Sequence, residues 1–164
     1  MNIHLLEWAL VSFILGVALS LPLAGVHYDN SNSWAKLFTN PRKLKSAHID
    51  FFMQAFSAGL VYLLEWATKS ELPPFIVIPL IFGIICNPII LLLESTSFYR
   101  SGFTAMVYRV LQSTSPVGLL FAWIAIAVYF LPLKLMIFIS FLLLIGVVVI
   151  WKHRREIIMG RGSI

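Results

Sequence analysis

Four long runs of apolar residues, separated by short polar segments, place this chain in the membrane class of proteins. The runs cover about 5–26, 46–68, 75–93 and 117–151. A hydrocarbon core of roughly 30 Å is crossed by about 20 helical residues, so each run is long enough to span it. Only 12% of the residues are charged and 60% are hydrophobic, too few polar side chains to cover a soluble core. We predict an all-α polytopic transmembrane helical bundle that forms one domain over residues 1–164.

The last run is too long for one span. Its 35 residues would extend about 52 Å as a single helix at 1.5 Å per residue. Pro132 and Lys134 divide it, and a turn at this point gives spans over about 115–131 and 133–151. The chain then has five spans. The alternative is four spans with a long, bent last helix.

The distribution of basic residues favours five spans. With the N-terminus outside, ten of the twelve Lys and Arg residues fall on the inner side, as the positive-inside rule requires. These ten are Lys36, Arg42, Lys43, Lys45, Arg100, Arg109, Lys152, Arg154, Arg155 and Arg161. They flank apolar runs and are not gathered into one groove, so we expect membrane lipid and no nucleic acid as a partner. We expect a bacterial cytoplasmic membrane, with the connection 95–115 lying in its interface.

Ionisable and amide side chains inside spans mark candidate sites, because lipid offers them no partners. At 100° per residue, Asp50, Gln54 and Glu65 share one face of the second span within about 80°. His48 lies on nearly the opposite face. Such a helix suits an oligomer in which one face serves its own subunit and the other completes a neighbour's site. The third span adds Asn87, and it ends with the acid Glu94.

Each of these residues also has a purely structural explanation. Asn87 and Gln54 can hold helices together by hydrogen bonds. His48 can lie among lipid headgroups near the start of its helix. Glu65 and Glu94 lie near helix ends, where long side chains reach the interface. The one cysteine has no partner for a disulfide and no metal-binding spacing with histidine.

The segment 40–54, Asn-Pro-Arg-Lys-Leu-Lys-Ser-Ala-His-Ile-Asp-Phe-Phe-Met-Gln, resembles a known family. It is similar to the start of the second helix in small membrane isomerases typified by styrene oxide isomerase and hydroxylaminobenzene mutase. His48, Asp50 and Gln54 stand at the family's histidine, acid and carboxamide positions, with Gln54 in place of the usual Asn. Asn87 falls where the family has an Asn in its third helix. The resemblance covers about residues 5–95.

The resemblance implies a homotrimer that binds haem b between subunits. His48 would be the axial ligand of the iron, and Gln54 and Asn87 would position the substrate. Ferric haem acts there as a Lewis acid on the oxygen of a small hydrophobic substrate. Leu91 replaces the tyrosine of the epoxide isomerases and Gly83 replaces their acid, so the resemblance does not extend to the identity of the substrate.

We therefore expect a haem-dependent isomerase that rearranges a small hydrophobic molecule. The reaction would convert an epoxide to a carbonyl compound or rearrange an arylhydroxylamine. The opposing prediction is a non-catalytic protein that binds haem or is purely structural. A transporter is a weaker third prediction, because the sequence has no visible repeat.

Overall fold

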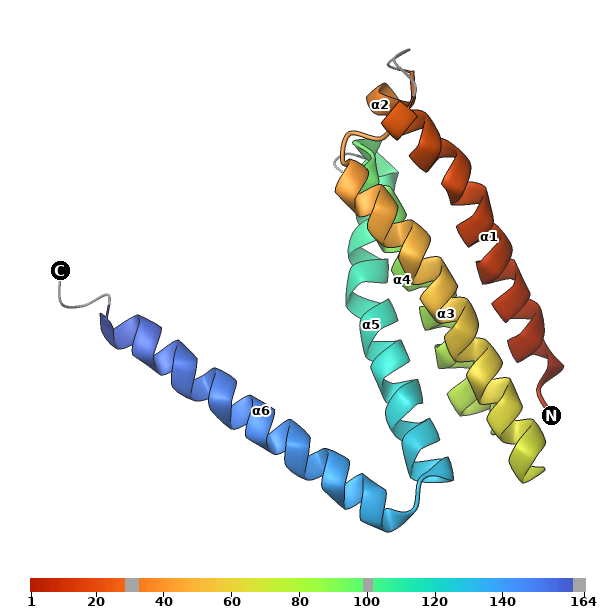
Figure 1. Cartoon of the computed structure of the whole chain (residues 1–164), viewed down its shortest axis with the longest axis vertical. Helices are drawn as coiled ribbons and strands as arrows, with labels where there is room; N and C mark the ends of the chain where they lie inside the picture. The colour runs from red at the N-terminus through yellow and green to blue at the C-terminus, as the bar shows by residue number, and fades with distance from the viewer. Residues whose placement is uncertain (29–32, 99–101, 161–164) are drawn as a thin grey trace. The chain divides into compact units, whose positions relative to one another are not determined.

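A computed structural model describes residues 1–28, 33–98 and 102–160, and these residues form helices and no strands (Figure 1). The helices are α1 (Ile3–Tyr28), α2 (Ser33–Leu37), α3 (Pro41–Thr68), α4 (Pro74–Ser95), α5 (Gly102–Phe130) and α6 (Leu133–Gly160). All but the short α2 are long and apolar enough to cross a membrane. The structure thus confirms the all-α polytopic architecture and the five predicted spans. Helix α5 ends before Pro132, so the alternative of one long last helix is wrong.

The connection predicted over 95–115 is largely wrong, because α5 already begins at Gly102. No proline lies between this glycine and Pro116, so nothing in the backbone prevents a helix there. Mixed polar and aromatic composition suits a helix in the interface as well as a loop, so composition alone does not distinguish the two. Arg100 and Arg161, counted above as inner charges, lie outside the described residues.

Contacts divide the chain into two compact units, residues 1–125 and 126–164. The first unit contains every residue singled out above as a candidate site residue. The second consists of the end of α5 and the whole of α6. Between Lys134 and Lys152, every residue of helix α6 except Ser140 and Gly146 has an apolar side chain, as expected of a helix that crosses lipid.

In the first unit, α3 packs against both α1 and α4 (Figure 1). Three of the seven buried residues of α3 are alanines, namely Ala47, Ala55 and Ala58. The facing side of α1 is small as well, and its Ser12 hydroxyl donates to the carbonyl of Phe51 at 2.9 Å. Small side chains let membrane helices approach closely, which substitutes for the hydrophobic effect that lipid removes.

Prolines set where the two central helices begin. Pro41 is the first residue of α3, and the Asn40 side chain caps this end by accepting from the Lys43 N–H. Pro74 begins α4 in the same way. Proline suits the first helical position, where its missing N–H has no intrahelical partner to lose.

Helix α5 lies close to α4 at Gly83. A Cβ atom added to Gly83 would lie 2.7 Å from the Cβ and 3.2 Å from the Cα of Leu119. The backbones of the two helices therefore approach because position 83 has no side chain.

We predict that Gly83→Ala lowers the melting temperature of the detergent-solubilised protein. The added methyl group has to push α5 away, and overpacking of this kind costs about 1–3 kcal/mol. Gly59→Ala in α3 is the matched control, since a Cβ there meets no atom within 4 Å. Equal melting temperatures for the two variants would contradict the close approach.

Candidate functional site

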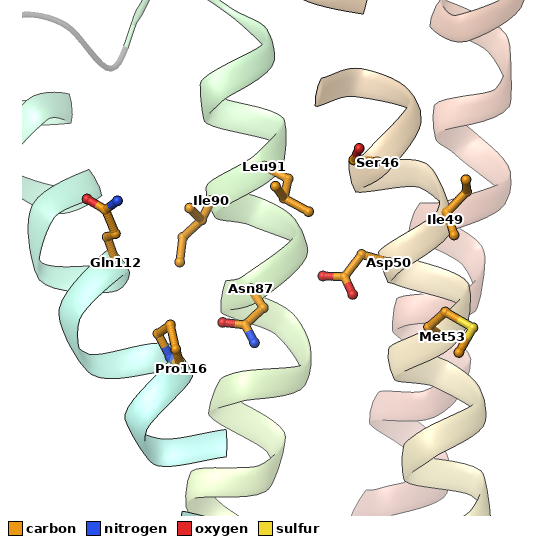
Figure 2. A pocket seen from close by; sticks show the side chains of 9 residues that line it. All are labelled: Ser46, Ile49, Asp50, Met53, Asn87, Ile90, Leu91, Gln112 and Pro116. Carbon is orange, nitrogen blue, oxygen red and sulfur yellow. The ribbon is translucent and has the colours of Figure 1, made fainter. Parts of the chain in front are cut away.

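A cavity of about 510 Å³ lies between α3, α4 and α5 in the first unit. It is lined by Ser46, Ile49, Asp50, Met53, Asn87, Ile90, Leu91, Gln112 and Pro116 (Figure 2). Most of the lining is apolar, and the polar groups are few. Such a cavity suits a small hydrophobic molecule with one or two polar atoms.

Asp50 supplies the only carboxylate among the lining residues of this cavity. Figure 2 shows its side chain pointing from α3 toward α4. Gln54, one turn along α3, donates from Nε2 to Oδ1 of Asp50 at 3.3 Å. Gln54 does not line the cavity itself, so its contribution there is to orient the carboxylate. The sequence analysis placed these two side chains on one face of the helix, and the structure confirms this.

Asn87 presents its amide to the same cavity from α4. The Ser115 hydroxyl of α5, which is fully buried, donates to Oδ1 of Asn87 at 2.7 Å. This bond fixes the amide so that its oxygen lies on the α5 side and its nitrogen on the other (Figure 2). The cavity therefore offers an acceptor from Asp50 and a donor from Asn87. Together they can bind a ligand that has both a donor and an acceptor.

His48 lies on another side of α3 and does not line this cavity. Its Nδ1 is 2.8 Å from the carbonyl oxygen of Gly16 in α1. A carbonyl can only accept, so in the neutral imidazole Nδ1 carries the proton and Nε2 carries the lone pair. The edge of the imidazole also meets Phe52, with ring centroids 4.9 Å apart. Within one chain, the His48 imidazole and the Asp50 carboxylate therefore lie on different sides of α3 and do not form one site.

The protonation of His48 matches that of a histidine that binds a metal. Metal-binding histidines usually donate their second ring N–H to a carbonyl or carboxylate, which orients the ring and makes the other nitrogen more basic. Among the described residues, no three His, Cys, Asp or Glu side chains are grouped to hold a free metal ion. A single imidazole is nevertheless the donor that haem iron takes from a protein. The hydrogen bond at Nδ1 is thus the one that an axial haem ligand would make with its second ring nitrogen.

Glu65 lies at the other end of α3 from His48, is fully buried and holds a corner of the bundle together. Its carboxylate accepts from the backbone N–H of Asn2 at 2.7 Å, from the Asn2 amide at 2.6 Å and from the Leu72 N–H at 2.8 Å. These bonds join the start of α1 and the α3–α4 turn to the end of α3. Glu65 is therefore not brought to the cavity.

Glu94 makes a similar junction at the opposite end of the bundle. It pairs with Lys43 at the start of α3 and accepts from the Tyr108 hydroxyl of α5 at 2.7 Å. Three helices are thus joined by one carboxylate, which is only 16% exposed. Like Glu65, it lies outside the cavity lining.

Three apolar lining residues, Ile49, Met53 and Ile90, were not predicted as part of this site. The same is true of Ser46, Gln112, Ser115 and Pro116. The last three lie on α5, at or near the junction of the predicted connection and span. If 102–130 is read as a helix, Gln112, Ser115 and Pro116 fall on one face, at spacings of three and four residues. This spacing could have indicated from the sequence that the three residues lie on one face of a helix.

We predict that Glu65→Gln lowers the melting temperature although the side chain keeps its size. Three donors meet this carboxylate, and glutamine replaces one accepting oxygen with a donating NH₂ group. A buried donor left without an acceptor costs about 1–3 kcal/mol. Glu7→Gln, which removes an exposed carboxylate paired with His4, should leave the melting temperature unchanged. A Glu65→Gln protein as stable as the parent would contradict this structural role.

Comparison with known proteins gives no relative. No protein-family model, no curated protein and no solved structure matches the chain. The resemblance carried by the segment 40–54 therefore stays a prediction, and the function is inferred from the site.

Proposed function

We propose that this chain is a haem-dependent isomerase of a bacterial cytoplasmic membrane, acting on a small hydrophobic substrate. The observation that carries the proposal is the hydrogen bond between Nδ1 of His48 and the Gly16 carbonyl. In the neutral imidazole it places the proton on Nδ1 and the lone pair on Nε2, which is the tautomer an axial iron ligand needs. The resemblance of residues 40–54 to membrane isomerases points to the same histidine.

His48 would hold the iron, and ferric haem, when bound, supplies a Lewis acid for the substrate oxygen. Asp50 accepts a hydrogen bond from a substrate that carries a donor, such as an arylhydroxylamine, and the amide of Asn87 donates one to the substrate oxygen. Gln54 keeps the Asp50 carboxylate in place. The apolar lining, which includes Ile49, Met53, Ile90 and Leu91, excludes water that would otherwise trap a reactive centre.

The proposed reaction is an intramolecular rearrangement, so it needs no oxidant, reductant or second substrate. For an epoxide, a C–O bond breaks, a hydrogen moves with its electron pair to the neighbouring carbon, and a carbonyl forms. For an arylhydroxylamine, the N–O bond breaks and a C–O bond forms on a ring carbon, which loses its hydrogen as a proton while the nitrogen gains one. All atoms of the substrate are kept in the product in both cases.

The proposal includes a homo-oligomer, with the trimer of the resembling family as the expected state. His48 and the Asp50 cavity lie on different sides of α3, so one chain alone does not bring them together. A second copy that places its cavity beside His48 would complete the site. This use of two faces is what the spacing of His48 and Asp50 along α3 predicts.

We predict that His48→Ala abolishes haem binding. The purified parent, reconstituted with ferric haem in detergent, should show a Soret band, and the variant should not, because its iron ligand is gone. His4→Ala is the matched control, since His4 is exposed at the far end of α1 and pairs with Glu7. A parent protein that takes up no haem would overturn the proposed function and leave the non-catalytic, structural alternative.

When a panel of aryl epoxides and arylhydroxylamines is assayed, we predict that Asp50→Asn keeps the Soret band and loses most of its activity on the arylhydroxylamines, whose N–H and O–H groups can donate to the Asp50 carboxylate. Replacing a hydrogen-bonding carboxylate with an amide should lower kcat/KM by about 10-fold or more, as expected for hydrogen bonds to charged groups. Glu7→Gln removes a carboxylate remote from the cavity and should retain parental kcat/KM. Haem binding without turnover by the parent would instead identify a non-catalytic haem protein.

A further inference from the structure

A second, smaller hollow opens between α1 and α3 near the basic start of α3. It has a volume of about 340 Å³ and is lined by Ser20, Leu23, Ala24, His27, Tyr28 and Lys45. All but Lys45 come from the last two turns of α1. None of the candidate site residues described above lines it.

The polar groups of this hollow favour a negatively charged ligand. Lys45 brings an ammonium group, and among the described residues no carboxylate pairs with it. His27 and Tyr28 bring a ring N–H and a phenol. The Ser20 hydroxyl already donates to the Val17 carbonyl. The lining contains no carboxylate, so an oxyanion would meet donors and one full positive charge without repulsion.

The hollow lies one turn away from the proposed iron ligand on both helices. On α1, Ser20 follows Gly16 by four residues, and on α3 Lys45 precedes His48 by three. These intervals correspond to about 4.5–6 Å along each helix axis. The hydrogen bond between His48 and Gly16 connects the same two helices that form the hollow. The imidazole and the ammonium group therefore lie about one turn apart on the side of α3 that faces α1.

We propose that this hollow anchors the propionate carboxylates of the haem whose iron His48 holds, with Lys45 as the main partner. The inference rests on the proposed function and extends it to the edge of the cofactor. It assigns Lys45 a role in orienting the porphyrin, because a macrocycle held only by one axial bond is free to rotate about it. An anionic lipid phosphate offers similar oxygens at this basic end of the bundle and is the competing ligand.

The test compares haem b with its dimethyl ester, in which both propionates are neutral. Soret titrations of the apo-protein in neutral detergent should show that the parent binds haem b about tenfold more tightly than the ester, as one charge-assisted bond predicts. Lys45→Met should bind both porphyrins as weakly as the parent binds the ester. Lys45→Arg should restore the preference. Lys36→Met is the matched control, since this lysine lies on α2 and does not line the hollow.

Each outcome supports or overturns the inference. An unchanged preference for haem b in Lys45→Met overturns it and leaves His48 ligation intact. Absence of a Soret change in the parent with either porphyrin overturns the proposed function as well. Mass spectrometry of co-purified phosphatidylglycerol forms the second arm. If Lys45→Met loses this lipid and keeps the porphyrin preference, the hollow binds lipid phosphate and the propionate assignment is wrong.

Discussion

Lipid offers no hydrogen bonds, so every polar group that α3 brings into the membrane needs a partner within the protein. The helix meets this requirement in four places along its length. Glu94 pairs with Lys43 near its start, Gly16 binds His48, Gln54 binds Asp50, and Asn2 with Leu72 surrounds Glu65 near its end. These contacts extend to α1, α4 and α5. The helices of the first unit thus supply the hydrogen-bond and ion-pair partners that the polar side chains of α3 need.

The carboxylates of Glu65 and Glu94, at the two ends of the bundle, accept more bonds from the protein than the carboxylate of Asp50 does. Glu65 accepts three hydrogen bonds from the protein and is fully buried, so a ligand cannot reach its oxygens. Asp50 has one bond, of 3.3 Å, to a neighbour on its own helix and faces a cavity. A carboxylate is therefore structural where it is buried and bonded to several protein donors. It is available where it faces a cavity and accepts only one such bond. This difference makes Asp50 the better candidate for binding a substrate.

Sequence periodicity predicted the parts of this molecule that depend on one helix at a time. The apolar runs predicted five spans, the division at Pro132 was correct, and 100° spacing placed Asp50 and Gln54 together and His48 apart from them. Contacts between helices were beyond this reasoning. Nothing in the sequence indicates that Ser115 faces Asn87, or that Leu119 packs on Gly83, because pairing depends on how α5 is rotated against α4. Glu65 was selected for its charge, and only the fold reveals that Asn2, 63 residues away, occupies its oxygens.

Pro116, which lines the larger cavity, also changes the hydrogen bonding of the α5 backbone. Pro116 has no N–H, so the main-chain carbonyl of Gln112, four residues earlier in α5, lacks the donor that an α-helix normally provides. Both residues line the cavity. A main-chain acceptor of a cavity-lining residue therefore lacks its helical donor whatever side chain position 112 carries. Replacing Pro116 by alanine would return that donor to the helix.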